Sequence, residues 1–319
     1  MLAVACAALA ANGAAQDWKP ARHVEIHAPS AAGGGSDTIA RLVQKLLQEH
    51  KLVAVTTSVV NKPGAGGAIA WAGLNQHPGD AHTIAISTAN LLTNHITGAS
   101  TLNYTDLTPI AQLFSEPVGV AVRAGSPLMG GKELIARLRA DPAALSAAIG
   151  TSLGNSGHIT LALAAKAAGG DAKKLKAVVF SAAAQGMAAL LGGHVDLVAS
   201  PVSNLVPHVQ GGSIRVLAVS APQRLAGALA GVPTWRELGA DVVIDNLRGI
   251  VGPRNLSAAQ VAYWEAALKR MTETGEWLRS LEQNAWTESY TGAAGSRNEL
   301  KRQYDEMRGG LAELGLARN

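Results

Sequence analysis

The sequence holds one cysteine, few aromatic residues and little charge, and each shortage excludes a class of protein. The single cysteine, Cys6, stands near the start of the 319 residues, so the chain can form no internal disulfide and no site with several cysteine ligands. Lys and Arg number 27 against 23 Asp and Glu, and no run of basic residues is longer than two, so we expect no nucleic-acid partner. Aromatic residues make up only 4%, which disfavours an aromatic-rich β-sandwich.

Apolar residues and glycine are plentiful instead. The chain is 48% hydrophobic and 16% charged, so it can bury one large core or two modest ones and does not have the composition of a disordered protein. Its 35 glycines suit the tight turns of an α/β protein. After residue 15, no apolar run reaches the ~20 residues that span a bilayer.

Residues 1–15 (MLAVACAALAANGAA) are uncharged and almost entirely apolar. They are typical of the apolar region of a secretory signal peptide, and the small residues Gly13 and Ala15 predict cleavage after Ala15. We therefore expect a signal peptide over 1–15 and a periplasmic mature chain without cysteine. Two alternatives stay open, a buried N-terminal helix and a lipid attached to Cys6.

Strand, glycine turn and helix alternate along the first third of the chain. Alternating apolar residues predict a strand over 23–28, and apolar positions three and four apart predict a helix over 37–49. The pattern continues with strands over 53–60 and 83–87 and a helix over 68–76. Helices between strands imply parallel strands, right-handed crossovers and a doubly wound sheet.

A second series of the same kind begins after Pro117. It predicts strands over 118–122, 147–150, 177–180, 196–199 and 216–220, with helices over 131–140, 158–168 and 185–191. The tail has helical spacing over 258–274, 276–283 and 297–314. Two series predict two lobes, each a doubly wound α/β sheet with flanking helices. Residues 16–116 plus 222–319 are expected to form the first lobe, and residues 117–221 the second.

The most informative segment is Pro29–Asp37, at the carboxyl end of the first predicted strand. Its three glycines let the backbone approach a ligand closely, and the N–H groups that open the following helix attract an anion. The glycine spacing fits neither a Walker A loop nor a dinucleotide-binding loop. The alternative is a plain glycine turn with Ser36 or Asp37 as helix cap. The ligand contacts predicted here are Ser30, Gly33, Gly34, Gly35, Ser36 and Asp37.

Two further loops carry hydrogen-bond donors at the ends of predicted strands. Thr151–Gly157 combines hydroxyls, an amide and glycine between a strand and a helix. Ser87-Thr88-Ala89-Asn90, at the end of the strand over 83–87, adds further donors. Open α/β sheets bind ligands at such carboxyl ends, so the loops of the two lobes are predicted to face each other across a crevice. Helix capping is the alternative for each loop. These loops add Ser87, Thr88, Thr151, Ser152 and Asn155 to the candidate site.

Motifs for catalysis, metal binding or cofactor binding are scarce. The chain has no HExxH or SxxK motif, and no predicted helix carries a pair of histidines spaced as metal ligands. We therefore assign no catalytic residue, no metal ligand and no cofactor.

The order of several segments resembles that of a known family. Pro-x-x-x-Gly-Gly-Gly-Ser-Asp at 29–37, Asn-Lys-Pro-Gly-Ala-Gly-Gly at 61–67 and Leu-Leu-Gly-Gly-His-Val-Asp-Leu at 190–197 follow one another as in the Bug family. These proteins are the TctC-like periplasmic receptors of tripartite tricarboxylate transporters. Further similar segments lie at 103–111, 217–220 and 232–234, and the resemblance runs from about Pro20 to the C-terminus.

The resemblance implies a two-lobed periplasmic-binding-protein fold of type II, the Venus-flytrap fold, which closes on a small carboxylate. It maps the family's binding loops onto 29–37 and 150–157. This chain has Phe180 and Ser181 where the family often has Tyr-Lys, and Ser181 joins the candidate site. Arg248 joins it as well, because it stands near the place of a family aromatic residue and can contact a carboxylate through two N–H groups.

The resemblance also implies a receptor and not an enzyme. We expect it to capture a di- or tricarboxylate, an acidic amino acid or an aromatic acid, and to act as a monomer. The partners implied are the membrane permease subunits of a tripartite tricarboxylate transporter. Two alternatives stay open: a periplasmic hydrolase with Ser152 or Ser181 as nucleophile, and a sensor that signals to a membrane partner. A hydrolase needs a base positioned by a third group, and the sequence indicates none.

Overall fold

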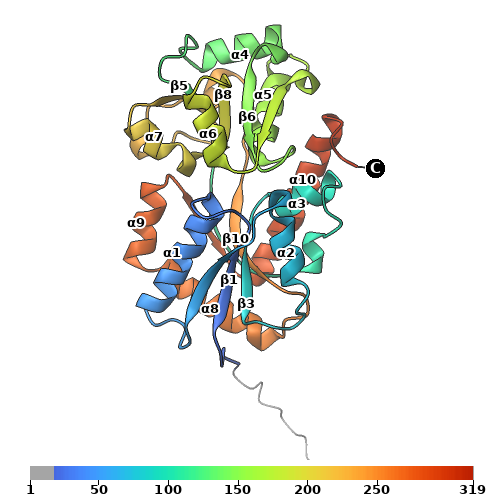
Figure 1. Ribbon diagram of the computed structural model, residues 1–319, viewed down its shortest axis with the longest axis vertical. Helices are drawn as coiled ribbons and strands as arrows, with labels where there is room; N and C mark the ends of the chain where they lie inside the picture. Colours follow the sequence, from blue (N-terminus) through green and yellow to red (C-terminus); the bar gives the residue numbers. More distant parts are fainter. Residues whose placement is uncertain (1–17, 319) are drawn as a thin grey trace, which may run out of the picture.

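Two β-sheets form the centres of two lobes, one above the other in Figure 1. The computed structural model describes residues 18–318, so the predicted signal peptide over 1–15, with Cys6, lies outside the described residues. The prediction of a two-lobed α/β fold is confirmed. Within residues 18–318, no helix has both the length and the apolar character needed to cross a membrane.

The sheet of the first lobe is mixed, where the sequence predicted parallel strands. Its strand order is β11-β4-β10-β3-β1-β2. β1 (Val24–Ala28) lies parallel to β2 (Thr57–Asn61) and β3 (Thr83–Ser87), as predicted. β10 (Leu247–Gly252) runs antiparallel to β3 and to β4 (Thr108–Ser115), and β11 (Thr287–Thr291) runs antiparallel to β4. The antiparallel strand β10 arises because the chain leaves the lobe after β4 and re-enters it from the other lobe.

The second sheet has the strand order β7-β6-β8-β5-β9 and is also mixed. β6 (Ser146–Gly150) lies parallel to β7 (Lys176–Phe180) and β8 (Leu197–Pro201). β5 (Val118–Arg123), the strand that enters the lobe, is antiparallel to β8 and to β9 (Ile214–Val219). The carboxyl ends of β6, β7 and β8 therefore share one edge of this sheet.

Helices flank both sheets (Figure 1). In the first lobe they are α1 (Gly35–Glu49), α2 (Ala68–Leu74), α3 (Asn90–Ile96), α8 (Ala258–Thr272), α9 (Gly275–Gln283) and α10 (Ala293–Glu313). In the second lobe they are α4 (Gly131–Ala140), α5 (Ser156–Ala167), α6 (Ala183–Leu191) and α7 (Val206–Gln210).

Each sheet has its own hydrophobic core. Ile26 of β1 packs in the first core with Leu46 of α1 and Trp264 of α8. Ile149 of β6 packs in the second core with Leu161 of α5. Burying such a side chain stabilises the fold by roughly 1.5–3 kcal/mol. Because the two cores are separate, the lobes can move relative to each other without opening either core.

The chain crosses between the lobes twice. The first crossing lies at Glu116-Pro117, between β4 and β5. We expected the return near residue 222, but Trp235 and Val242 are buried in the core of the second sheet, and Thr234 forms a β-bridge with Val219. The buried tryptophan anchors this turn-rich segment to the second lobe. We therefore propose that the second lobe extends to about residue 244 and that the return lies just before β10.

Helix α10 connects the lobes on one side. Leu300 and Leu311 of α10 form one apolar cluster with Leu92 of α3 in the first lobe and Ile159 of α5 in the second. In Figure 1, α10 rises from the lower lobe to the level of the upper one. Its packing therefore spans the junction that any closure of the lobes must accommodate.

Candidate functional site

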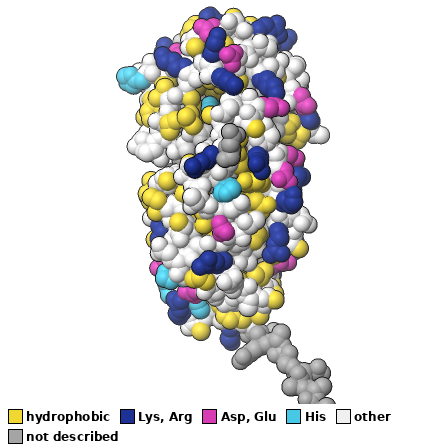
Figure 2. Space-filling model, turned by 90° about the vertical axis from the view of Figure 1, so that its right-hand side faces the viewer, with side chains coloured by type: hydrophobic (Ala, Val, Ile, Leu, Met, Phe, Trp, Pro, Cys, Tyr) yellow, Lys and Arg dark blue, Asp and Glu magenta, His cyan; other side chains and the backbone are white. Residues whose placement is uncertain are grey.

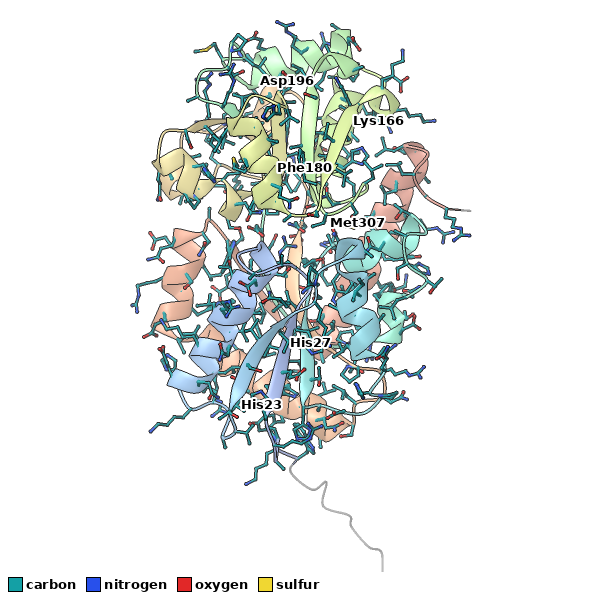
Figure 3. The ribbon with its side chains drawn as sticks, viewed as in Figure 1. His23, His27, Lys166, Phe180, Asp196 and Met307 are labelled. Carbon is teal, nitrogen blue, oxygen red and sulfur yellow. The ribbon has the colours of Figure 1, made fainter. Side chains whose placement is uncertain are left out.

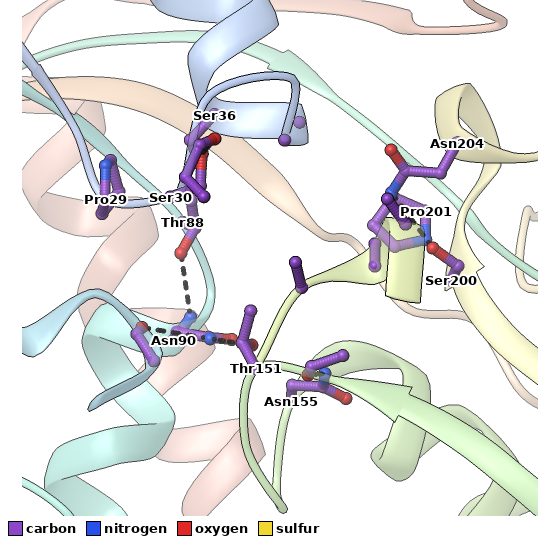
Figure 4. Close-up of a pocket in the computed structure, with 18 of the residues that line it drawn as sticks. Pro29, Ser30, Ser36, Thr88, Asn90, Thr151, Asn155, Ser200, Pro201 and Asn204 are labelled. Carbon is purple, nitrogen blue, oxygen red and sulfur yellow. Dashed lines mark hydrogen bonds between the residues drawn. The ribbon is translucent and has the colours of Figure 1, made fainter. Parts of the chain in front are cut away.

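A cleft lies between the two sheets, where the loops after β1, β3, β6, β7 and β8 meet (Figure 4). Its volume is about 890 Å³, including the mouth that opens to solvent. Most predicted site residues line it, and Asp37, Ser87 and Ser152 do not. The predicted residues in the lining are Ser30, Gly33, Gly34, Gly35, Ser36, Thr88, Thr151, Asn155, Ser181 and Arg248.

Asp37 does not line the cleft but stabilises the first loop through hydrogen bonds. Its buried carboxylate accepts hydrogen bonds from Gly33 N at 2.9 Å, Arg41 Nε at 3.0 Å and Asn61 Nδ2 at 2.8 Å. Burial by itself raises the pKa of Asp37, but the hydrogen bonds from Arg41, Gly33 and Asn61 outweigh it and hold the pKa below its ordinary value. Asp37 is therefore an ionised anchor of the loop.

The loop uses some of its own N–H groups and leaves others for a ligand. Gly33 N donates to Asp37, and Gly34 N donates to Ala31 O at 3.0 Å. The next two N–H groups, of Gly35 and Ser36, open α1 and have no hydrogen-bond partner among residues 18–318. Gly34 is the N-cap of α1 and has no side chain to cap the helix, while the third N–H, that of Asp37, donates to Ser30 Oγ at 3.2 Å. Gly35 N and Ser36 N are thus the N–H groups of this loop that are available to an anion.

The second loop, Gly150–Gly157, presents the start of α5 from the opposite lobe. Asn155 caps this helix, because its Oδ1 accepts from His158 N at 2.9 Å and its Nδ2 donates to Gly150 O. Ser156 follows as the first residue of α5 and lines the cleft. Asn155 is therefore a helix cap, because both polar atoms of its side chain bond within the loop. The start of α5, which Asn155 caps, lines the same cleft as the first loop.

Ser152 stands in a Gly-x-Ser-x-Gly motif, Gly150 to Gly154, between β6 and α5. This motif was missed in the sequence. In α/β-hydrolases this pattern exposes a nucleophilic serine beside a histidine. Here Ser152 Oγ is buried without a hydrogen-bond partner and lies beside Gly66 of the other lobe. No histidine, aspartate or glutamate belongs to the described lining of the cleft. Among residues 18–318, no base is hydrogen-bonded to Ser152 Oγ.

Asn90 bridges the lobes at the cleft. Its Nδ2 donates to Gly66 O at 3.2 Å in its own lobe and to Thr151 Oγ1 at 3.0 Å in the other (Figure 4). Thr151 holds φ at +65°, a conformation that few non-glycine residues adopt, and its N–H donates to Phe180 O. The sequence placed Asn90 among the donors at this edge of the sheet, but its bond to Thr151 could not be predicted because the two residues lie in different lobes.

Among the lining residues that the sequence did not predict are the polar side chains of Ser200, Asn204 and Asn246. Asn204 Nδ2 donates to Ser200 Oγ at 3.0 Å, so the loop after β8 adds amide and hydroxyl groups to the cleft. The start of α6 joins them through residues 182–184, and no side chain caps this helix. Ser181, just before it, donates to Gln185 Oε1 at 2.7 Å. Polar residues after β7 and β8 were the available signal for these groups.

Arg248 is the charged residue of the described lining. Its Nη2 lies 3.1 Å from Glu116 Oε2, and its Nη1 donates to Asn246 Oδ1 at 2.8 Å. Glu116 is itself buried at the first crossing and accepts from Trp286 Nε1 and Ser203 N, both at 3.2 Å. Both terminal nitrogens of Arg248 thus have protein partners in the wall of the cleft, and each keeps a second N–H.

The titratable residues outside the cleft form no metal site among residues 18–318. His27 on β1 and His23 just before it lie away from the junction of the lobes (Figure 3), and His27 Nε2 lies 2.8 Å from Glu25 Oε2. Burial lowers the pKa of His158, whose Nδ1 accepts from Gly154 N at 3.0 Å. On the face shown in Figure 2, basic and acidic side chains are interspersed over both lobes.

The chain is similar in sequence and structure to proteins of one known family. Residues 39–310 match the model of the tripartite tricarboxylate transporter family receptor. A relative from Cupriavidus necator, "UPF0065 protein in gbd 5'region", is 28% identical over 280 residues, which are 88% of this chain and 83% of that protein.

Two solved structures share the fold. The R. palustris protein Rpa4515, solved with adipate, is 23% identical and has a TM-score of 0.85 over 93% of this chain and 99% of that chain. MatC from Rhodopseudomonas palustris, with bound malate, is 22% identical and has a TM-score of 0.80 over 92% and 99%. The family match covers most of the chain, and the resemblance seen in the sequence is confirmed. The chain belongs to the tripartite tricarboxylate transporter receptor family, the family of the Bug proteins.

Proposed function

We propose that this chain is an extracytoplasmic receptor that captures a small organic carboxylate in its cleft and delivers it to a membrane permease. The observation that carries the proposal is the pair of unpartnered N–H groups of Gly35 and Ser36, within the described residues, at the start of a 15-residue helix that opens onto the cleft. A helix start of this kind binds an anion through fixed donors and the helix dipole.

The second lobe supplies matching groups. The starts of α5, at Ser156, and of α6, at Ala183, line the same cleft, so three helix N-termini converge on it. No acidic side chain of the described residues lines the cleft to repel a carboxylate. The bound adipate and malate of the two structural relatives support the same ligand class for this chain.

The receptor is proposed to be a periplasmic monomer that is exported by its signal peptide, and not an enzyme. Ser152 Oγ is buried without a hydrogen-bond partner and Ser181 Oγ donates to the Gln185 amide, so neither hydroxyl is bonded to a general base among the described residues. This supports a binding role over a hydrolytic one. N-terminal sequencing of protein exported by a host cell is expected to find Gln16 first; Met1 at the start would contradict export by cleavage.

A ligand screen tests the proposed function. Protein purified from a host periplasm is unfolded in denaturant and refolded to strip any ligand. It is then titrated calorimetrically with malate, succinate, glutarate, adipate, citrate, aspartate and benzoate, with sulfate as the inorganic control. We expect at least one carboxylate to bind with a Kd of about 1 μM or tighter, near −8 kcal/mol. Binding of none of them would contradict the proposal.

A further inference from the structure

Asn246 carries a buried donor that has no partner among the described residues. The residue is 1% exposed and lines the cleft, next to the first crossing, where Glu116 N donates to its carbonyl oxygen. Its Oδ1 accepts from Arg248 Nη1 at 2.8 Å. Arginine has only donors, so the amide oxygen must face Arg248 and the NH₂ group must point the other way. A buried donor without an acceptor is unfavourable, so this NH₂ group, which has no partner among residues 18–318, is a candidate donor to a ligand.

The charge beside Asn246 is already balanced. Glu116 lies 3.1 Å from Arg248 Nη2, and the two side chains are 2% and 10% exposed. Glu116 is also fixed by Trp286 Nε1 and Ser203 N, so it cannot turn away from the arginine without losing these bonds. A second carboxylate bound to Arg248 would share one guanidinium with the Glu116 carboxylate in a poorly solvated place, where like charges repel strongly.

We propose that Asn246 and Arg248 form a second subsite, at the hinge end of the cleft, for an uncharged acceptor oxygen such as that of an amide, a ketone or a hydroxyl. The inference rests on the proposed function, in which Gly35 N and Ser36 N bind the carboxylate of the same ligand. The ligand class is then a monocarboxylate with an uncharged acceptor at its far end, and the Glu116 charge discriminates against a dicarboxylate of the same length.

Matched ligands test the subsite. Succinate, glutarate and adipate are each compared by calorimetry with their monoamides and with butanoate, pentanoate and hexanoate, which lack the far acceptor. For the chain length that fits, the monoamide is expected to bind at least about fivefold more tightly than both the dicarboxylate and the plain acid.

Two variants separate charge from hydrogen bonding. Glu116→Gln removes the negative charge beside Arg248 and keeps an acceptor for Trp286. The affinity for the dicarboxylate, divided by that for the monoamide, is therefore expected to rise by at least about tenfold. Asn246→Ala removes the donor, so the monoamide is expected to lose its advantage while the plain acid keeps its affinity. Glu282→Gln, at an exposed position of α9 far along the chain from the crossings, is the matched control and is expected to change no ratio.

The outcomes distinguish the inference from the proposed function. Equal affinities for amide and dicarboxylate in the unchanged protein would overturn the subsite and leave the carboxylate receptor standing. So would an equal loss for all ligands in Asn246→Ala, which is the expectation for a merely structural residue. If none of the carboxylates binds, the proposed function and the inference fall together. If Glu116→Gln does not fold, the Asn246→Ala variant and the relative affinities of the three ligand types for the unchanged protein still test the subsite.

Discussion

Asp37 shows how a charged residue in a binding loop can serve the loop and not the ligand. The sequence placed it among the ligand contacts, but its carboxylate lies outside the lining and holds Gly33 N, Arg41 and Asn61. Gly33 in turn needs its glycine, because its φ is +75°. The pair fixes the turn that aims Gly35 N and Ser36 N into the cleft.

Replacing Asp37 by Asn is expected to lower the free energy of unfolding by about 1.5–3 kcal/mol near neutral pH, because hydrogen bonds to a charged acceptor are lost. The folded protein holds the pKa of Asp37 below its ordinary value, mainly because hydrogen bonds from Arg41, Gly33 and Asn61 overcome the effect of burial. The stability from Asp37 is therefore present above the ordinary carboxylate pKa and is lost as the pH falls through the lowered pKa. Urea unfolding over a pH series should show a smaller acid-side decline in the variant; an identical decline would contradict this role.

At the same scale, the sequence could predict which loops meet the ligand better than which atoms do so. The glycines of the first loop were recognised by their position after a strand. Which N–H groups stay unpartnered depends on bonds such as Gly34 N to Ala31 O, which no spacing reveals. The contact of Glu116 with Arg248 joins the two crossings and depends on the complete fold.

Among the elements, those with clear apolar periodicity were predicted within a few residues, and those without it were missed. The helix predicted over 37–49 is α1, Gly35–Glu49, whose Ile39, Val43 and Leu46 are buried. β10 was missed because all six of its residues are buried, so its sequence does not alternate. β11 was missed because this edge strand, Thr287–Thr291, is polar.

The start of α5 gives an element-scale prediction. Asn155→Ala removes the cap on His158 N and the bond to Gly150 O, and is expected to lower the free energy of unfolding by about 1 kcal/mol. Ligand affinity is expected to fall as well, because the amides that follow lose their fixed direction. Urea unfolding and calorimetry measure the two effects. Asn155→Asp keeps the capping acceptor and is expected to recover most of the stability; no difference between the two variants would contradict the capping role.

On the scale of the whole molecule, the two lobes have separate hydrophobic cores and are joined by two crossings of the chain, an arrangement that allows them to close on a ligand. The lobes already touch through the bond from Asn90 to Thr151 and through the α10 cluster that includes Ile159. The groups proposed to bind the ligand come from both lobes, so a ligand that bridges them favours the closed arrangement.

Closure is expected to reduce the radius of gyration. Small-angle X-ray scattering of the stripped protein, without ligand and with a saturating carboxylate, is expected to show a smaller radius with ligand. The rotation is expected about Glu116-Pro117 and the return just before β10. An unchanged radius at saturation would contradict a closing motion.

The central claim is that a carboxylate binds to the amides that open α1, and Gly35 offers the most direct test. A β-carbon added at Gly35 would have Asn204 Oδ1, across the cleft, as its nearest neighbour at 3.9 Å, so the loop tolerates a side chain that fills the cleft. At Gly34, by contrast, it would meet Ser30 Oγ at 2.9 Å and deform the loop. Gly35→Val is therefore the cleaner variant.

The deciding measurement is calorimetric titration of Gly35→Val with the carboxylate that binds the unchanged protein most tightly. Gly309→Ala, where a β-carbon would meet nothing within 4 Å, serves as control. The account predicts that Gly35→Val keeps its unfolding midpoint and loses binding, to a Kd weaker than about 1 mM, while Gly309→Ala binds as before. Unchanged affinity in Gly35→Val would show that the carboxylate does not lie on these amides.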